Sequence, residues 1–433
     1  MSQETCVYPK FTRKMRETHT ILLPMMLPIH FSMLQCIFEQ EGYHAELLTN
    51  TGRSVVDEGL KYVHNDTCYP ALLVIGQFID ALKSGRYDVD RVAVAITQTG
   101  GGCRASNYIH LLRKALVKAG FGQVPVISLN LSGLELTSGF RITLRMLRKG
   151  ISTVVYGDML TLLRNQVQAY EITPGSTASL TSRWLAELTA QFEKKQGLTT
   201  AAIRRNLNRM AEDFSRIPVC RTPKVRVGIV GEIYVKYSAL ANNDLEAFLH
   251  SQDCEVCVPG LMGFLLYCFH NPSVDRSLYG GGFFRSRLSR LALRYLINRE
   301  HLITEALKPY PQFCPPASFD RLAQFGEQVI GQGVKMGEGW LLPAEMMELV
   351  SNGCPNIVCV QPFGCLPNHI CGKGVMHTIK QLNPLANIVA IDYDPGATKV
   401  NQENRIKLML AVAREQLSAN PTQGSPAPET VPV

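Results

Sequence analysis

Hydrophobic and polar positions along the first third of the chain alternate between two periods. Short apolar runs typical of buried strands occur at 20–25, 44–48, 91–97 and 124–130. Segments with helical spacing lie between them, at 31–42, 71–84 and 105–119. Because strands that alternate with helices favour a parallel sheet wrapped by helices, the pattern predicts a first α/β domain over 1–139.

The rest of the chain repeats this alternation after a helical stretch. Segment 140–215 carries polar helical patterns at 182–195 and 201–214, which predict a helical connection. Strands are expected at 224–233, 254–258, 356–360 and 387–393, and helices at 243–251, 343–352, 370–382 and 398–417. These elements predict a second α/β domain over 216–419, with a helical insertion at 261–330.

The fold class expected from this order is α/β, with two doubly wound domains of the Rossmann or flavodoxin type. The tail at 420–433 is rich in Pro, Ser, Gly and Thr and almost uncharged, so we expect it to be disordered. With 46% apolar and 18% charged residues over 433 positions, the composition is that of an ordinary folded protein. Because no apolar stretch approaches the ~20 residues needed to cross a bilayer, and no secretory block is visible, a cytoplasmic protein without membrane contact is expected.

The net charge of +8 raises the question of a nucleic-acid partner. Arg287, Arg290 and Arg294 recur at helical spacing, but without the interleaved aromatic residues that stack bases. A solvated helix face is therefore the favoured interpretation, and no nucleic-acid partner is expected. The alternative is a surface that attracts an anionic small molecule or an acidic protein.

Thirteen cysteines without an export signal favour reduced thiols and metal ligation over a disulfide framework. Four of them lie in loops rich in Gly or Pro, at Cys68, Cys103, Cys359 and Cys365. Cys68 precedes an apolar helix whose amino end stabilises a thiolate. Cys103 and Cys365 follow strands and Cys359 lies at a strand end, where ligands of open α/β sheets bind. We therefore predict an iron–sulfur cluster in the cleft between the domains, with two thiolates from each. A zinc site with four thiolates is the competing interpretation.

The remaining cysteines fit a shared site less well. Cys254 and Cys257 lie three apart on a predicted strand, so their side chains point to opposite faces and core packing is favoured. Cys354 lies before the predicted strand at 356–360 and Cys365 lies after it, so Cys354 is a poor partner for Cys365. Cys371 is a reserve ligand, and Cys6 belongs to an amino-terminal segment that could fold over the cleft. The others are interpreted as buried or incidental thiols: Cys36, Cys220, Cys268 and Cys314.

Several longer motifs carry a resemblance. They are Glu-Gly-Leu-Lys-Tyr-Val-His-Asn-Asp-Thr-Cys-Tyr-Pro at 58–70, Gln-Thr-Gly-Gly-Gly-Cys-Arg-Ala-Ser-Asn-Tyr at 98–108, Val-Gly-Glu-Ile at 230–233, Gly-Glu-Gly-Trp at 337–340, Gln-Pro-Phe-Gly-Cys-Leu-Pro-Asn-His at 361–369 and Asp-Tyr-Asp-Pro-Gly-Ala at 392–397. Over about 18–410 the chain resembles the 2-hydroxyacyl-CoA dehydratase superfamily. It is most similar to the carboxyl-terminal part of the large activase-related proteins, which are allied to the double-cubane cluster proteins.

This resemblance implies an iron–sulfur electron acceptor in an ATP-dependent, low-potential reductase or dehydratase system acting on a small or CoA-linked substrate. Cys68, Cys103, Cys359 and Cys365 match the ligand positions. Double-cubane proteins use six cysteines, so four matches favour a single 4Fe-4S cluster, with a double-cubane as the alternative. The chain has no phosphate-binding Gly-x-x-x-x-Gly-Lys-[Ser/Thr] loop, so ATP would be hydrolysed by an iron–sulfur activase in trans.

Polar residues beside these cysteines suggest chemical roles. Arg104 and Lys373 would place positive charge near the cluster and anchor an anionic substrate, although Arg104 could equally clamp its own loop. His369 is a candidate proton donor, or a hydrogen-bond partner of its own loop. Asn107 and Asn368 are expected to brace the loops, and Glu232 and Glu338 are candidate acids. Asp392 and Asp394 are expected to cap the following helix, with cation binding as the alternative.

Two other functions stay open at this stage. The chain could be a non-catalytic iron–sulfur scaffold or electron relay, or a zinc-stabilised binding protein. No Gly-x-Ser-x-Gly elbow, His-Glu-x-x-His pair or His-Arg-Asp loop supports a hydrolase or a kinase. A homodimer is compatible with the sequence.

Overall fold

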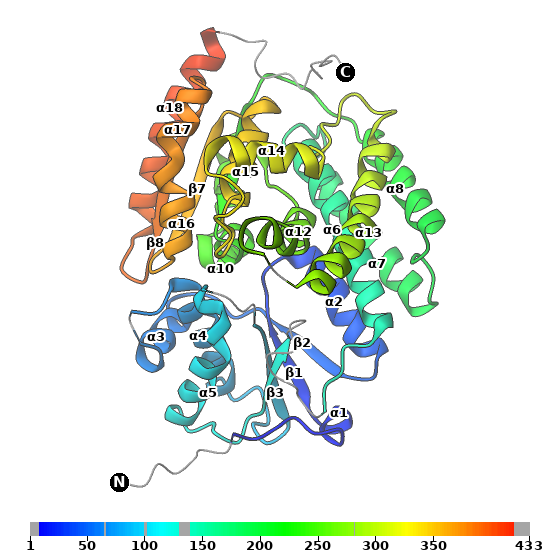
Figure 1. Ribbon diagram of the computed structural model, residues 1–433, viewed down its shortest axis with the longest axis vertical. Coiled ribbons are helices and arrows are strands. Elements are labelled where there is room, and N and C mark those ends of the chain that lie inside the picture. Colours follow the sequence, from blue (N-terminus) through cyan, green and yellow to red (C-terminus); the bar gives the residue numbers. More distant parts are fainter. Residues whose placement is uncertain (1–7, 65, 99–101, 130–138, 281, 420–433) are drawn as a thin grey trace. The chain divides into compact units, whose positions relative to one another are not determined.

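The computed structural model describes residues 8–64, 66–98, 102–129, 139–280 and 282–419 (Figure 1). The chain divides into two compact units. The first runs to Gly150 and also contains Pro362–Cys365 and Tyr393–Gly396. The second contains Ile151–Gln361, Leu366–Asp392 and the chain from Ala397 onward. Each unit is described by itself.

The first unit is built on a four-stranded sheet. Its strands are β1 (Thr20–Pro24), β2 (His44–Leu48), β3 (Val92–Thr97) and β4 (Val126–Leu129), in the order β2-β1-β3-β4. All three pairings are parallel, and Thr20 at the start of β1 pairs with His44 on one side and Val92 on the other. The strand order reverses between β1 and β3, so a crevice is expected at the carboxyl ends of these two strands.

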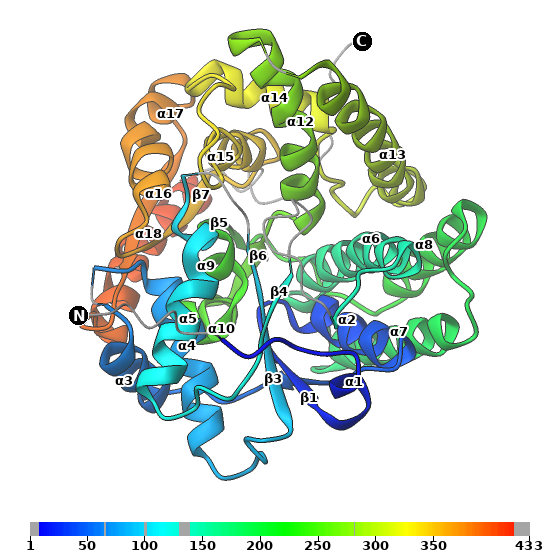
Figure 2. The same ribbon diagram turned by 60° about the horizontal axis from the view of Figure 1, so that its bottom comes forward.

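Helices cover both faces of the first sheet. Its helices are α1 (Met15–Thr18), α2 (Pro28–Gln40), α3 (Arg53–Tyr62), α4 (Tyr69–Lys83) and α5 (Tyr108–Lys118). Helices α3, α4 and α5 lie together on one side and α2 on the other (Figures 1 and 2). Two glycines let α3 and α4 approach closely, because a Cβ on Gly76 would lie 2.1 Å from the Val55 carbonyl oxygen. The other is Gly59, whose Cβ would lie 2.5 Å from the Leu72 carbonyl oxygen.

The second unit repeats the sheet topology of the first. Its strands are β5 (Val225–Gly231), β6 (Cys254–Cys257), β7 (Asn356–Pro362) and β8 (Asn387–Tyr393), in the order β6-β5-β7-β8. β5 pairs in parallel with both β6 and β7. Every residue of β5 and β7 is buried, which explains their almost unbroken apolar sequence. The order reverses between β5 and β7, so the same argument places a crevice at their carboxyl ends.

Most helices of the chain belong to this second unit. Those before β7 are α6 (Leu144–Gln168), α7 (Ser176–Glu193), α8 (Thr200–Ser215), α9 (Ile233–Tyr237), α10 (Ala239–Asn242), α11 (Leu245–Ser251), α12 (Leu261–Tyr279), α13 (Phe283–Leu307), α14 (Phe319–Val329) and α15 (Leu341–Ser351). After β7 come α16 (Leu366–Cys371), α17 (Met376–Leu382) and α18 (Lys399–Ala419). None of the helices among the described residues is long and apolar enough to cross a membrane.

The α/β class with two parallel sheets agrees with the prediction, whereas the division of the chain differs from it. The expected connection at 140–215 belongs almost entirely to the second unit, because the units divide at Gly150. Helix α3 was not predicted, and α6 was expected only as part of the helical connection at 140–215. In α6, Gly150 and the run Ile151–Val155 of mainly β-branched residues weaken the helical signal, and tertiary packing overrides it. The tail at 420–433 lies outside the described residues.

Candidate functional site

The carboxyl edge of the first sheet begins at Gln98, the residue after β3. Its Nε2 donates a hydrogen bond to the carbonyl oxygen of Ser106 at 2.9 Å, and Ser128 Oγ donates to its Oε1 at 2.8 Å. Ser106 Oγ in turn donates to the carbonyl oxygen of Cys103 at 2.7 Å. This chain of bonds ties the loop of Cys103, a partly exposed residue, to the ends of β3 and β4. Residues 99–101 of the glycine run lie outside the described part.

The segment 363–365 packs against Cys68 within the first unit. The Tyr69 N–H donates to the carbonyl oxygen of Phe363 at 2.9 Å, and a Cβ on Gly364 would lie 3.0 Å from the Cα of Cys68. Gly364 also has a φ of +73°, so both the backbone conformation and the close approach require glycine. Since Cys365 follows directly, two of the predicted ligands are carried by backbone segments in contact. Both cysteine side chains are buried.

Tyr108 links the third predicted ligand to the same place. Its hydroxyl lies 2.9 Å from Cys68 Sγ. Only the 3₁₀ helix η1 (Arg104–Asn107) separates Tyr108 from Cys103. The loops of Cys68, Cys103 and Cys365 therefore belong to one compact unit and converge on the first residues of α4.

Cys359 belongs to the second unit. The first unit therefore contains three of the four predicted ligands and the second unit one, whereas two in each were expected. Cys359 is fully buried on β7, with Sγ 4.0 Å from Asn368 Oδ1. A Cβ on Gly372 would lie 3.1 Å from this sulfur. Burial raises the pKa of Cys359 to about 12 and that of the reserve candidate Cys371 to about 11. Both thiols are therefore protonated at neutral pH unless a metal displaces the proton.

Among the described residues, no group of three or more His, Cys, Asp or Glu side chains is arranged to hold a metal ion. A four-iron cluster is larger than one ion, so its thiolates stand further apart than those of a mononuclear site. The sulfur donors of Cys68, Cys103 and Cys365 suit such a group chemically, and Gly364 lets the backbone of the Cys365 segment pack against that of Cys68. Cys6 lies outside the described residues.

Two predicted acids meet at the carboxyl end of β5. Glu232 follows Gly231 and accepts the N–H of Val235 at 2.9 Å, which caps α9. Glu338 accepts the N–H of Ile233 at 3.0 Å. Removal from water raises the pKa of Glu232 to about 8, and repulsion from Glu338 is the second cause. Burial also raises the pKa of Glu338. The pair can therefore hold and release a proton near neutral pH at the predicted crevice of the second sheet.

The three predicted catalytic residues are exposed and divided between the units. Arg104 lies in η1 of the first unit, whereas His369 on α16 and Lys373 lie in the second. His369 Nδ1 is hydrogen-bonded to the side-chain amide of the buried Gln361 on β7. This bond fixes the ring at the same strand end as Glu232. Asn368 Nδ2 donates to the carbonyl oxygen of Val360 at 3.3 Å, which supports the expected bracing role, whereas Asn107 makes no side-chain capping bond to α5.

The predicted capping role of Asp392 and Asp394 is wrong. Asp394 accepts the N–H of Gly396 at 2.7 Å, which closes a turn before the helix. Asp392 lies 3.5 Å from Arg405. The side chain of Thr398 accepts the N–H of Asn401 at 3.4 Å, so Thr398 is positioned at the start of α18, where the cap was expected.

A buried ion pair supports this edge of the second sheet and was not predicted. Lys236 on α9 donates to both carboxylate oxygens of Glu345 on α15, at 2.9 and 3.1 Å. Each side chain is only 4% exposed. The pair attaches α9, and with it the Glu232 cap, to the core helix α15. No local pattern indicates this ion pair, because Lys236 and Glu345 come from separate elements whose contact depends on the fold.

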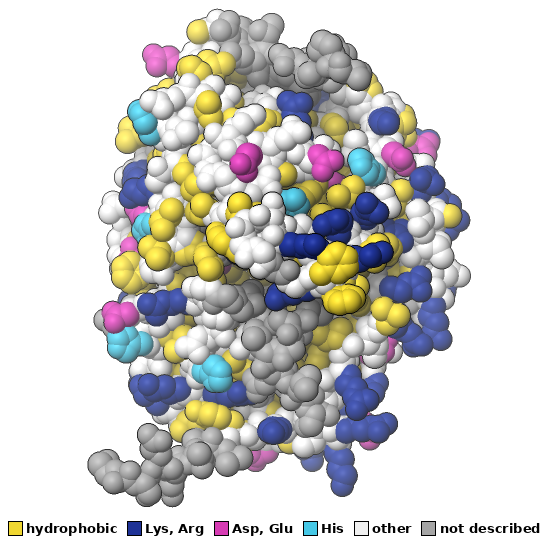
Figure 3. All heavy atoms as spheres, viewed as in Figure 1, with side chains coloured by type: hydrophobic (Ala, Val, Ile, Leu, Met, Phe, Trp, Pro, Cys, Tyr) yellow, Lys and Arg dark blue, Asp and Glu magenta, His cyan; other side chains and the backbone are white. Residues whose placement is uncertain are grey.

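The arginine-rich helix is α13, and its first half is exposed. Arg287, Arg290 and Arg294 all reach solvent. Contrary to expectation, large apolar side chains accompany them, since Phe284 is 85% exposed and Leu288 is 71% exposed. Figure 3 shows basic and hydrophobic side chains gathered over the region where α13 lies in Figure 1. The surface is therefore mixed in character, not a purely solvated face.

The chain was compared with models of protein families, with curated proteins and with solved structures, and no match was found in any of the three.

Proposed function

We propose that this protein is the iron–sulfur, electron-accepting component of an ATP-dependent low-potential reductase or dehydratase system that acts on a small or CoA-linked substrate. The observation that carries the proposal is the contact between the Cys68 and Cys365 segments, joined by the Cys103 loop through Tyr108. Thiolates on rigid, glycine-containing turns at strand and helix ends are what an iron–sulfur cluster requires.

Cys68, Cys103 and Cys365 of the first unit would hold the cluster, whereas the predicted ligand Cys359 and the reserve ligand Cys371 belong to the second unit. A bound 4Fe-4S cluster would supply one-electron chemistry. The amino end of α4 next to Cys68 would stabilise the negative charge of thiolates. The Tyr108 hydroxyl would donate a hydrogen bond to the Cys68 sulfur, which tunes the reduction potential.

In the second unit, chain residues would handle protons. Glu232 and Glu338, whose pKa values are raised, would hold a proton at the carboxyl end of β5, and His369 is held at the end of β7 by Gln361. Arg104 and Lys373 are exposed cations that can attract an anionic substrate such as a CoA ester. The substrate would arrive from solution, and the ATPase would be a separate iron–sulfur protein.

Anaerobic purification tests the proposal. We expect a brown protein that contains iron and acid-labile sulfide and gives the electron paramagnetic resonance signal of a reduced cluster with a strong chemical reductant. Zinc without iron would support a zinc-stabilised binding protein instead. A cluster that is reduced readily by ordinary cellular donors, without an ATPase, would support the scaffold or relay function.

A further inference from the structure

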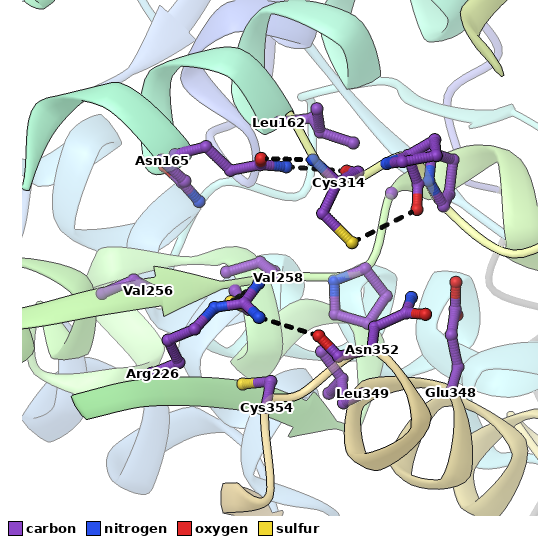
Figure 4. A pocket seen from close by; sticks show the side chains of 16 residues that line it. Leu162, Asn165, Arg226, Val256, Val258, Cys314, Glu348, Leu349, Asn352 and Cys354 are labelled. Atoms are coloured by element: carbon purple, nitrogen blue, oxygen red, sulfur yellow. Dashed lines mark hydrogen bonds between the residues drawn. The ribbon is translucent and has the colours of Figure 1, made fainter. Parts of the chain in front are cut away.

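A separate pocket in the second unit gathers three cysteines around an arginine (Figure 4). Its volume is about 90 Å³. The polar and sulfur-bearing side chains in its wall include those of Cys257, Cys314, Cys354, Arg226, Asn352 and Glu348. None of the predicted cluster ligands lines it. The pocket therefore requires an explanation of its own.

Arg226 on β5 is the charged centre of this pocket. Its Nε donates to Glu255 at 3.0 Å, and its Nη1 donates to the carbonyl oxygen of Asn352 at 2.7 Å. Its Nη2 is directed at Cys257 Sγ, 3.8 Å away. The Tyr170 hydroxyl donates a hydrogen bond to the other carboxylate oxygen of Glu255 at 2.6 Å. The guanidinium is thus fixed rigidly, with one nitrogen facing a sulfur.

Cys257 and Cys354 are direct neighbours although they come from different elements. Cys257 is the last residue of β6, and Cys354 lies in the turn before β7. Both side chains line the pocket, and Cys257 is close enough to Cys354 to interact with it directly. Cys254, the other half of the Cys-x-x-Cys sequence, instead directs its thiol toward the Gln252 carbonyl oxygen at 3.5 Å.

The two neighbouring thiols differ in environment. Cys257 is the accessible member: it is partly exposed, and its Sγ lies 3.8 Å from Arg226 Nη2 and 3.8 Å from a carboxylate oxygen of Glu255. Cys354 is fully buried, and burial raises its pKa well above the usual range. We propose that Cys257 and Cys354 form a redox-active pair that a hydroperoxide oxidises to a disulfide, with Cys257 as the attacking sulfur and Cys354 as the resolving sulfur.

The oxidation balances with one hydroperoxide. The Cys257 thiolate attacks the terminal oxygen of the hydroperoxide, the O–O bond breaks, and the departing oxygen leaves with the former thiol proton as an alcohol or as water. This gives a sulfenic acid on Cys257. Cys354 sulfur then attacks the Cys257 sulfur, the S–O bond breaks, and hydroxide leaves with the Cys354 proton as water. Two thiols lose two electrons in total, and a cellular dithiol returns them by exchange.

Differential alkylation of the full-length, anaerobically purified protein tests this proposal. After one equivalent of hydrogen peroxide, peptide mass spectrometry should show a Cys257–Cys354 cross-link, while Cys254 stays alkylatable as the matched control on the same strand. Before oxidation, Cys257 should be alkylated about tenfold faster than Cys254. In Cys354→Ser, dimedone should trap a sulfenic acid on Cys257. In Cys257→Ser, no disulfide involving Cys354 should form.

Equal alkylation rates at Cys257 and Cys254, or a peroxide-induced disulfide that omits one member of the pair, would overturn the proposal. Circular dichroism shows whether the serine variants fold. If they do not, the alkylation rates and the cross-link in the unmodified sequence decide alone. Iron content, measured in the same samples, separates this chemistry from damage to a cluster.

Discussion

The backbone N–H of Tyr69 donates to the carbonyl oxygen of Phe363 at 2.9 Å, although the two residues lie far apart in the sequence. This bond belongs to a short return of the chain into the first unit at Pro362–Cys365. Through it, Cys365 is placed in the segment next to Cys68. The proposed function depends on this return, and its backbone geometry is testable independently of any metal.

Gly364→Ala should destabilise the first unit. The added Cβ would stand 3.0 Å from Cys68 Cα, and the residue must keep a φ of +73°. A left-handed conformation alone costs about 1–2 kcal/mol, and crowding of backbone atoms adds about 1 kcal/mol or more. Urea unfolding measures the total loss.

Gly85→Ala is the matched control for this substitution. Gly85 has nearly the same φ, +74°, but a Cβ there would meet nothing within 4 Å. It should therefore show the conformational cost without the crowding. Equal losses for the two alanine variants would show that the 363–365 segment is not pressed against Cys68.

Tyr108→Phe should lower the reduction potential of a bound cluster. The hydroxyl lies 2.9 Å from Cys68 Sγ, and a hydrogen bond to a ligating sulfur stabilises the more negative, reduced state. Removing it favours the oxidised state. A spectroscopic redox titration of the two proteins measures the shift, and a potential that is unchanged or higher would argue against Cys68 as a ligand.

Glu232→Gln should flatten the pH dependence of stability. An unfolded glutamate titrates near 4.5, whereas the pKa of Glu232 is raised to about 8 in the folded protein. Between these values the folded state binds more protons, so stability falls as the pH rises through this window, by at most about 1.4 kcal/mol per pH unit for this group. Below about pH 4.5 Glu232 is protonated in both states, so it no longer contributes to the pH dependence of stability.

The glutamine keeps an oxygen for the Val235 N–H but cannot ionise. We therefore expect the variant to be more stable than the unmodified protein at pH 8 and similar to it at pH 4.5, measured by urea unfolding. Glu415→Gln on the exposed face of α18 serves as the control. A slope identical to that of the unmodified protein would refute the raised pKa.

The Lys236–Glu345 pair should be strongly coupled. Replacing one partner, as in Lys236→Met, leaves a buried charge alone and should cost about 3–5 kcal/mol. The double variant Lys236→Met/Glu345→Leu should recover most of that loss, because no uncompensated charge remains. Chemical denaturation of the unmodified protein, the two single variants and the double variant completes the double-mutant cycle. Additive losses would mean that the ion pair does not form.

Much of the fold could be predicted because strand patterning is local. The strand at 44–48 matches β2, and that at 387–393 matches β8. Helix α3 was missed because it is short and contains Gly59, whose role is a close approach to α4 that only the folded structure reveals. The unit boundary was misplaced for a similar reason, since α6 joins the second unit through packing and not through its own pattern.

The candidate sites were only partly accessible to sequence reasoning. Glu232 and Glu338 stood out through flanking glycines, but their raised pKa values depend on burial and a tertiary contact. Cys354 was judged only against Cys365, and its pairing with Cys257 followed from no local spacing. Likewise, the return of Cys365 to the first unit depends on long-range chain routing. The residue types could be identified from the sequence, but their neighbours in three dimensions depend on the fold.

The most direct measurement is the iron and acid-labile sulfide content per chain of anaerobically reconstituted protein, for the unmodified sequence and for single alanine variants of Cys68, Cys103, Cys359 and Cys365. Cys254→Ala is the control, because that thiol is buried on β6 and proposed for no ligation. The account predicts bound iron and sulfide in the unmodified and control proteins and a loss of most of both in the Cys68, Cys103 and Cys365 variants. Iron and sulfide that persist unchanged in these three variants, or are absent from every protein, would contradict it.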